Sequence, residues 1–276
     1  MNQITVSQPN AASLVAVTRA ISASFAAGER THVQRQPLDV AAARNEHRAY
    51  EEALRGLGAS IVRAPEAPNL PDAVFVEDAA VVLDEVAVIT RPGAVSRRAE
   101  TASIAQVLSN YRPLEQLQPP ATLDGGDVLK VGHVLYVGRS TRTNSEAISQ
   151  LQSIVAPFDY RVVPVDVTGC LHLKSAVTAV GANRLLINRA WTDPNAFADS
   201  DLIDVDQREP FGANALLVGA SVIYPAHLPR TAERLENAGI SVIRTPCSEI
   251  AKAEGAVTCC SLVFPARGSW TSHIAS

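Results

Sequence analysis

Residues 122–139 read TLDGGDVLKVGHVLYVGR, and this stretch shows the unit from which the fold is built. A polar loop, Asp124-Gly125-Gly126-Asp127, opens two short apolar runs that end at Gly138-Arg139. Short apolar runs bounded by Gly and polar residues are typical of a β-hairpin. Helical spacing of apolar residues predicts a helix before the loop, at about 97–111, and another after the hairpin, near 145–155. The unit is therefore a helix, a short strand, a polar loop and a hairpin.

The same unit recurs along the chain at intervals of roughly 40 to 50 residues. Helices are predicted at about 39–57, 97–111, 145–155 and 231–238, and hairpins at 73–89, 128–137, 176–188 and 215–224. Gly58 and Gly239 follow two of these helices, where a C-terminal cap belongs. The apolar run 262–264 has no hairpin partner in its own unit, whereas 14–19 is a single strand with the expected ending. Pairing these two strands closes a ring of five units.

A closed ring of such units is a propeller. We predict the fold class α/β, a five-bladed pseudo-symmetric α/β propeller with ββαβ units around a central channel. The polar loop always precedes the hairpin, so the ring gathers loops that are far apart in sequence around one channel. These loops carry 72–78, Asp124, His172 and Cys259. A Rossmann fold is excluded because no strand is followed by GxGxxG.

Composition and charge exclude several classes of function. The chain has 24 Lys and Arg against 28 Asp and Glu, which gives a formal net charge of −4. A negative net charge does not favour binding to nucleic acid. The chain has no apolar run near the roughly 18 residues of a membrane-spanning helix, and residues 1–9 lack the pattern of a secretory signal. The four cysteines are too scattered for a disulfide scaffold and lack CxxC spacing. We expect a cytoplasmic protein with reduced thiols and no nucleic-acid or membrane partner.

Three residues from separate loops form a candidate catalytic set. Cys259-Cys260 lies where a strand is predicted to begin, so alternation would direct one thiol to the channel and the other to the core. Taken alone, the cysteine pair could equally be two buried core thiols. His172 could likewise be a core histidine, and Asp124 an ordinary turn residue. Together they match a nucleophile, a proton carrier and an acid that orients the imidazole.

The densest acidic cluster lies in an apolar run, with Asp72, Glu77 and Asp78 between residues 71 and 78. Buried carboxylates are costly unless they meet a cation. A planar guanidinium, with several forked donors, suits such a cluster. Metal binding is the alternative, but no HxH or HxxxH pair lies near it.

The chain resembles the dimethylarginine dimethylaminohydrolase family of the guanidine-modifying superfamily of five-bladed α/β propellers. Six motifs carry the resemblance in order: 70–78, 90–98, 123–129, 138–144, 171–175 and 258–261. The resemblance implies that residues 1–276 form a single catalytic domain that uses no cofactor and no metal. Its partner would be a small molecule, a methylated arginine. A homodimer is possible under this resemblance.

The resemblance also implies a role for particular residues. Cys259 would be the nucleophile, His172 the general acid and base, and Asp124 its supporting acid. The remaining implied residues contact the substrate: Asp72, Glu77, Asp78, Arg97, Arg142 and the backbone of Ala253, with both arginines at the α-carboxylate. A lid in relatives often carries an apolar residue near position 30, where this chain has Gly28-Glu29-Arg30-Thr31-His32.

The implied reaction is hydrolysis of N-methylated arginine to citrulline and a methylamine through a covalent thiouronium on Cys259. A cationic guanidinium beside the sulfur favours thiolate, so the substrate helps to activate its own nucleophile. Alternatives are a deiminase acting on arginine or another free guanidino amino acid, an amidinotransferase, and an inactive propeller that binds arginine-like ligands. The intact Cys259, His172 and Asp124 argue against the last.

Overall fold

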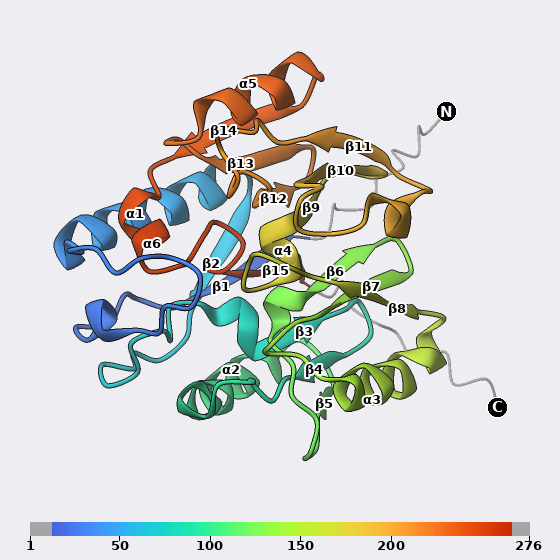
Figure 1. Cartoon of the computed structure of the whole chain (residues 1–276). Helices are drawn as coiled ribbons and strands as arrows, with labels where there is room; N and C mark the ends of the chain where they lie inside the picture. Colours follow the sequence, from blue (N-terminus) through green and yellow to red (C-terminus); the bar gives the residue numbers. More distant parts are fainter. Residues whose placement is uncertain (1–12, 267–276) are drawn as a thin grey trace, which may run out of the picture.

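Five three-stranded sheets surround a central axis in the computed structural model, which describes residues 13–266 (Figure 1). Within each sheet the inner strand pairs antiparallel with the middle strand, and the middle strand pairs parallel with the outer one. This is the five-bladed α/β propeller predicted from the repeats. Residues 1–9, for which we expected no secretory signal, lie outside the described part.

The sheets are β15-β1-β2, β3-β4-β5, β6-β7-β8, β9-β10-β11 and β12-β13-β14. The inner strands are β3 (Ala80–Val82), β6 (Val128–Val131), β9 (Val177–Gly181), β12 (Leu216–Val218) and β15 (Leu262–Pro265). The middle strands are β1 (Leu14–Thr18), β4 (Ala87–Ile89), β7 (Val134–Arg139), β10 (Arg184–Ile187) and β13 (Ser221–Pro225). The outer strands are β2 (Ala59–Arg63), β5 (Leu114–Gln116), β8 (Arg161–Asp166), β11 (Asp201–Asp204) and β14 (Ser241–Thr245).

Helices lie outside the sheets or in the connections that lead to the channel (Figure 1). The α-helices are α1 (Val40–Gly56), α2 (Thr101–Leu108), α3 (Ser145–Val155), α4 (Leu173–Ala176), α5 (Pro229–Asn237) and α6 (Ser248–Lys252). The 3-10 helices are η1 (Phe25–Ala27), η2 (Val76–Ala79), η3 (Val95–Glu100), η4 (Gly125–Asp127), η5 (Ala156–Phe158) and η6 (Pro194–Phe197). Among residues 13–266, no helix is long and apolar enough to span a membrane.

The ring closes where the sequence predicted it. The last strand, β15, pairs antiparallel with the first, β1, from Leu14 opposite Pro265 to Val17 opposite Leu262. Strand β1 also pairs parallel with β2, so one sheet is built from both ends of the described chain. The pairing completes the fifth sheet, and a propeller of such small sheets leaves only short edge strands.

The closed ring places the predicted polar loops together, because each lies just before an inner strand. Helix η2 precedes β3, η4 precedes β6, and the short α4 precedes β9. Asn214 comes shortly before β12, and the turn 257–260 comes shortly before β15. All five approaches to the channel therefore carry polar residues at corresponding positions.

Helix α1 fixes one wall of this region. Asp39 caps its N-terminus by accepting from the amides of Ala41 and Ala42. The buried carboxylate of Glu46 in turn accepts from the backbone amides of Glu249 and Ile250, the first turn of α6. An anion at a helix N-terminus is stabilised by the unpaired amides there. This contact positions α6, whose C-terminal end leads into the candidate site.

Two predicted elements differ in the structure. The apolar run 73–83 is not one strand, because Val76–Ala79 forms the 3-10 helix η2 and only Ala80–Val82 is extended. In an alternating strand, one of the two carboxylates in this run would point into the core without a partner. In the tight helix each carboxylate meets a cation instead. The predicted helix at 97–111 is likewise divided, with η3 followed by α2.

Candidate active site

A small cavity at one mouth of the channel brings most of the predicted residues together. Its walls are formed by residues of η2, η3, the lid and the connecting loops: Glu29, Asp72, Phe75, Asp78, Arg97, Asp124, Arg142, Leu171, His172, Ala253, Glu254 and Cys259. Of the residues singled out in the sequence, Glu77 does not line it. We call this cavity the front pocket.

Cys259 and Cys260 face different surroundings, as predicted, but for a different reason. They lie in a turn rather than in a strand, since β15 begins only at Leu262. Cys259 is partly exposed and lines the front pocket, whereas Cys260 is 1% exposed within the hydrophobic core. Burial, together with the carboxylates of Glu77 and Asp78, raises the pKa of the Cys259 thiol to about 12. The thiol is therefore protonated at neutral pH.

His172 is held by a carboxylate on each side of its ring. Its Nε2 lies 3.0 Å from Asp124 Oδ2, and its Nδ1 lies 3.9 Å from Asp78 Oδ1. Burial alone would lower the pKa of His172, but Asp78 and the hydrogen bond with Asp124 outweigh it and raise the pKa to about 9. The imidazole is therefore a cation at neutral pH. A side chain at Gly126 would come within 2.6 Å of Nδ1, so glycine lets the loop approach the ring.

Asp78 lies at the centre of the charged groups. Its Oδ2 accepts from Arg97 at 2.5 Å, and its Oδ1 accepts from the Gly126 amide at 2.9 Å. Burial would raise the pKa of Asp78, but the charges of His172 and Arg97 hold it below its usual range. Asp78 is therefore an anion shared by two cations, with one oxygen directed toward His172.

The two arginines predicted at the substrate carboxylate differ in their burial and in how many of their donors are already paired. Arg97 is buried, and its guanidinium also donates to Glu100 at 2.8 Å and to the Asp72 and Phe75 carbonyls. Arg142 lies at the rim and donates to Glu29 Oε2 at 2.9 Å. A carboxylate from the chain itself thus occupies Arg142 in this structure.

The lid segment Gly28–His32 is fastened over the front pocket by side chains at both of its ends. The Glu29 amide donates to Asp72 Oδ2 at 3.0 Å, and a Cβ at Gly28 would lie 2.2 Å from the other oxygen of Asp72. The amides of Thr31 and His32 donate to the Glu254 carboxylate at 2.6 and 2.7 Å. Ala253, buried beside Glu254, lines the pocket.

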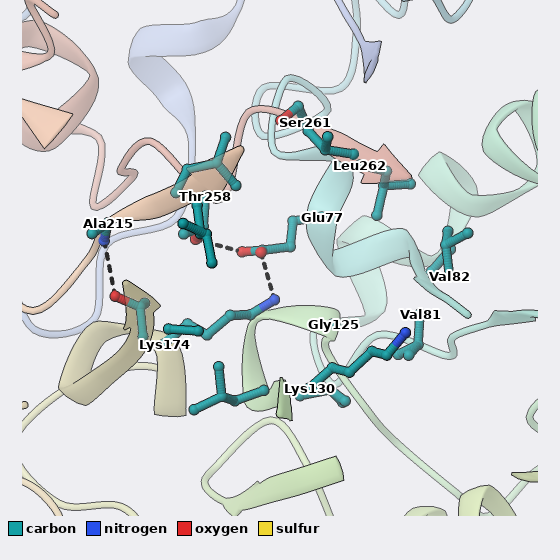
Figure 2. A pocket seen from close by; sticks show the side chains of 18 of the residues that line it. Glu77, Val81, Val82, Gly125, Lys130, Lys174, Ala215, Thr258, Ser261 and Leu262 are labelled. Carbon is teal, nitrogen blue, oxygen red and sulfur yellow. Dashed lines mark hydrogen bonds and ion pairs between the residues drawn. The ribbon is translucent and has the colours of Figure 1, made fainter. Parts of the chain in front are cut away.

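Glu77 lies outside the lining of the front pocket, and its contact with the substrate stays a prediction. Its carboxylate points away from the front pocket and meets Lys174 Nζ at 2.5 Å and the Thr258 hydroxyl at 2.8 Å (Figure 2). Glu77 and Asp78 are consecutive residues of a 3-10 helix, so their side chains diverge and each finds a different cation. Burial raises the pKa of Glu77, and Lys174 partly offsets that effect.

Sequence reasoning did not identify several residues that shape the site. Asp127 is fully buried and accepts from the Leu173 amide at 2.9 Å and from the hydroxyls of Ser140 and Thr143, which fixes the His172 loop against η4. Its place after Asp124-Gly125-Gly126 was the available signal, because two carboxylates three residues apart share one 3-10 turn. Glu29 and Glu254 gave no signal, since their partners are distant in sequence.

One group of side chains has the composition of a metal site. Ligand atoms of Asp78, Asp124 and His172 lie within 4.8 Å of one another. Asp78 already holds the Arg97 guanidinium, and His172 is itself cationic at neutral pH. Both positive charges oppose a metal cation at this position. The charge pattern instead suits a site that moves protons beside a nucleophile.

Comparisons with known proteins agree with this geometry. One solved structure, of a mutant of DDAH from Pseudomonas aeruginosa complexed with citrulline, matches with a TM-score of 0.86 and 34% sequence identity. The match covers 90% of this chain and 98% of that one. By sequence alone, N(G),N(G)-dimethylarginine dimethylaminohydrolases of P. aeruginosa PAO1 and Streptomyces coelicolor are 36% and 41% identical, each over 127 residues.

These two sequence matches cover 46% and 45% of this chain, and the chain spans about half the length of each relative, 50% and 48%. The model of the family described as N,N dimethylarginine dimethylhydrolase, eukaryotic, matches residues 21–196. That range is more than half of the 276 residues and includes the lid, the acidic cluster, Asp124 and His172. The predicted resemblance is thereby confirmed, and the chain belongs to the N,N-dimethylarginine dimethylhydrolase family.

Proposed function

We propose that this protein hydrolyses N-methylated arginine, asymmetric dimethylarginine or monomethylarginine, to citrulline and a methylamine. One observation carries the proposal: a partly exposed thiol, Cys259, lines the same pocket as a cationic histidine and several carboxylates. Such a pocket can hold a guanidinium beside a nucleophile and supply the proton that the leaving amine needs. The P. aeruginosa relative solved with citrulline supports the same product.

The substrate would lie with its guanidinium toward the carboxylates and its amino-acid end toward the lid. Asp72 and Asp78 both line the front pocket and would hold the cation. Arg142 would bind the α-carboxylate, in the place that Glu29 now takes. Arg97 adds positive charge nearby, although most of its donors are engaged. The Ala253 backbone would border the substrate.

The first half of the reaction uses the charges described above. The entering cation favours ionisation of the Cys259 thiol, whose proton leaves to solvent. The thiolate attacks the guanidinium carbon and forms a neutral tetrahedral species. His172, already protonated, donates its proton to the departing methylated nitrogen, while Asp124 keeps the ring oriented. The neutral amine leaves, and a cationic thiouronium remains on Cys259.

The second half returns the enzyme to its starting state. His172, now neutral, takes a proton from a water molecule that attacks the thiouronium carbon. The tetrahedral species collapses as its C–S bond breaks, and its hydroxyl proton passes to the Cys259 sulfur through solvent, which leaves the neutral ureido group of citrulline and restores the thiol. One histidine thus acts as acid and then as base, as microscopic reversibility requires of a two-step displacement.

A panel of four compounds tests the substrate class. We expect citrulline from dimethylarginine and monomethylarginine, with little from arginine. A decarboxylated analogue should react poorly, because losing the charged hydrogen bonds of Arg142 removes roughly 1.5–3 kcal/mol, about tenfold to a hundredfold in rate. Citrulline released fastest from plain arginine would replace the proposal by a deiminase, and equal turnover of the decarboxylated analogue would contradict the role of Arg142.

A further inference from the structure

A second cavity, separate from the front pocket, lies where β1 and β2 end beside α1 (Figure 1). The two strands are parallel, so the segments that follow them leave the sheet on the same side. The cavity has a volume of about 350 Å³. It is lined by residues 20–23 after β1, by residues 63 and 66–68 at and after the end of β2, and by Arg44, His47 and Arg48 of α1. We call it the side pocket, and it shares no lining residue with the front pocket.

The wall of the side pocket is predominantly positive. Arg44 and Arg48 lie one turn apart on the same face of α1, and Arg63 is the last residue of β2. Glu66 is the one carboxylate among the residues that line the pocket. The lining therefore carries three guanidinium groups against one acid. A concave site with charge of one sign attracts ligands of the opposite sign.

Two of these arginines have no acidic partner within residues 13–266. Arg44 donates to the Ile21 carbonyl at 3.4 Å, and Arg48 donates to the side-chain oxygen of Asn45. Arg63, in contrast, donates to the buried Glu51 carboxylate at 3.0 Å. A guanidinium has five N–H donors in a planar fork. Arg44 and Arg48 therefore keep most of their donors, and their full charge, for a ligand.

A buried histidine with an unpartnered nitrogen also lines the side pocket. His47 lies between the two arginines on the same face of α1 and is 4% exposed. Its Nε2 has no hydrogen-bond partner in the described part of the chain. Its Nδ1 lies 3.9 Å from Glu51, which is too far for a hydrogen bond. A buried polar atom without a partner costs stability, so the fold alone gives no reason for a histidine here.

The protonation state of His47 suits a donor to an anion. Burial lowers its pKa to about 4, and the charge of Glu51 offsets this only in part. The ring is therefore neutral at pH 7 and carries one N–H. Because no hydrogen bond requires that proton on Nδ1, it can lie on Nε2. A metal cation, another common ligand of a neutral imidazole, is opposed by the arginines of the same pocket.

We propose that the side pocket binds the phosphate group of a small phosphate ester. Arg44 and Arg48 would hold the phosphate oxygens through their forked donors, and His47 would donate from Nε2. A phosphate group carries nearly two negative charges at pH 7, which match two arginines without counter-ions, whereas a carboxylate brings one. Apolar residues, among them Ile21 and Pro68, line the rest of the pocket and leave room for the organic part of the ester.

Calorimetric titration of the full chain with phenyl phosphate, in phosphate-free buffer of constant ionic strength, tests the proposal. We expect saturable binding at one site. Arg44→Gln and Arg48→Gln should each weaken it about tenfold or more, the usual effect of losing a charged hydrogen bond. Arg55→Gln is the matched control, because this arginine lies on the same helix outside the side pocket. Arg142→Gln tests for binding in the front pocket and should leave the affinity unchanged.

Two further ligands test the chemistry of the group that is bound. Benzoate has the same ring with a single charge and should bind at least about tenfold more weakly than phenyl phosphate. Inorganic phosphate should also bind more weakly, because it leaves the apolar part of the pocket unfilled. Equal affinity for benzoate would contradict the assignment to phosphate. Equal affinity for inorganic phosphate would contradict the ester and make the free anion the ligand.

Folding of the variants is checked by citrulline formation and by the thermal midpoint. Arg44→Gln and Arg48→Gln change exposed side chains away from the front pocket, so both should keep wild-type activity. His47→Leu removes the unpartnered nitrogen and should weaken phenyl phosphate binding without lowering the midpoint. A lower midpoint with unchanged affinity would contradict the role of His47. Wild-type affinity in both arginine variants, loss of binding in Arg142→Gln alone, or no saturable binding to the wild type would overturn the proposal.

Discussion

Cys259→Ser should abolish hydrolysis of dimethylarginine, whereas Cys260→Ser should retain most of it. Only Cys259 lines the front pocket, and a serine hydroxyl is a far weaker nucleophile than the thiolate that the substrate induces. Loss of a covalent nucleophile typically costs about 10⁴-fold or more in kcat. Citrulline formation by the two purified variants, compared with the wild type, measures the difference.

The Cys260 variant needs one further control. Its sulfur packs in the core and donates to the Ala256 carbonyl at 3.6 Å, so serine there exchanges a buried apolar atom for a hydroxyl. A lower thermal midpoint with nearly normal kcat is the expected pattern. Activity lost only in Cys260→Ser, with that protein still folded, would assign the nucleophile to the second cysteine instead.

His172→Ala should lower kcat by about 10²- to 10⁴-fold, the usual contribution of a general acid and base. The reaction needs a thiolate together with an imidazolium, and the wild-type pKa values lie in the reverse order, about 12 for Cys259 and about 9 for His172. Wild-type kcat/KM should therefore rise with pH through the neutral range as the thiolate fraction grows. The rise should end near pH 9, where His172 loses its proton.

The break near pH 9 is the diagnostic feature, because the alanine variant has no group to produce it. In His172→Ala the residual kcat/KM should keep rising through that region. His133→Ala is the matched control, since this histidine is exposed and stacks on Tyr160 away from the front pocket. An unchanged break in His172→Ala would assign the ionisation to another residue.

The repeated pattern was enough to predict the ring and the residues around its channel. Helix, strand and hairpin recur with similar spacing, and the run 262–264, which has no hairpin partner in its own unit, pairs with the run 14–19 as predicted. The predicted helices at 39–57 and 145–155 correspond to α1 and α3 because caps and periodicity agree there. Strand β11 was not predicted, since its residues Asp201–Asp204 are two apolar residues between two acids and show no alternation.

Side-chain direction within the site could not be predicted from the sequence. Glu77 and Asp78 are adjacent, and only the 3-10 helix shows that one faces Lys174 and the other Arg97. Two lid amides meet Glu254 across more than 200 residues of sequence, at separations of 223 and 222. Contacts of that range depend on how the blades pack, for which a single sequence has no periodic signal.

The central claim, covalent catalysis at Cys259, is tested most directly by trapping the intermediate. Wild-type protein mixed with excess dimethylarginine and quenched in acid within milliseconds to seconds should carry an added mass equal to substrate minus dimethylamine. Proteolysis and mass spectrometry should place that mass on Cys259, and His172→Ala should change how much of it accumulates. Citrulline formation with no adduct at any time, or with the added mass on another cysteine, would contradict the account.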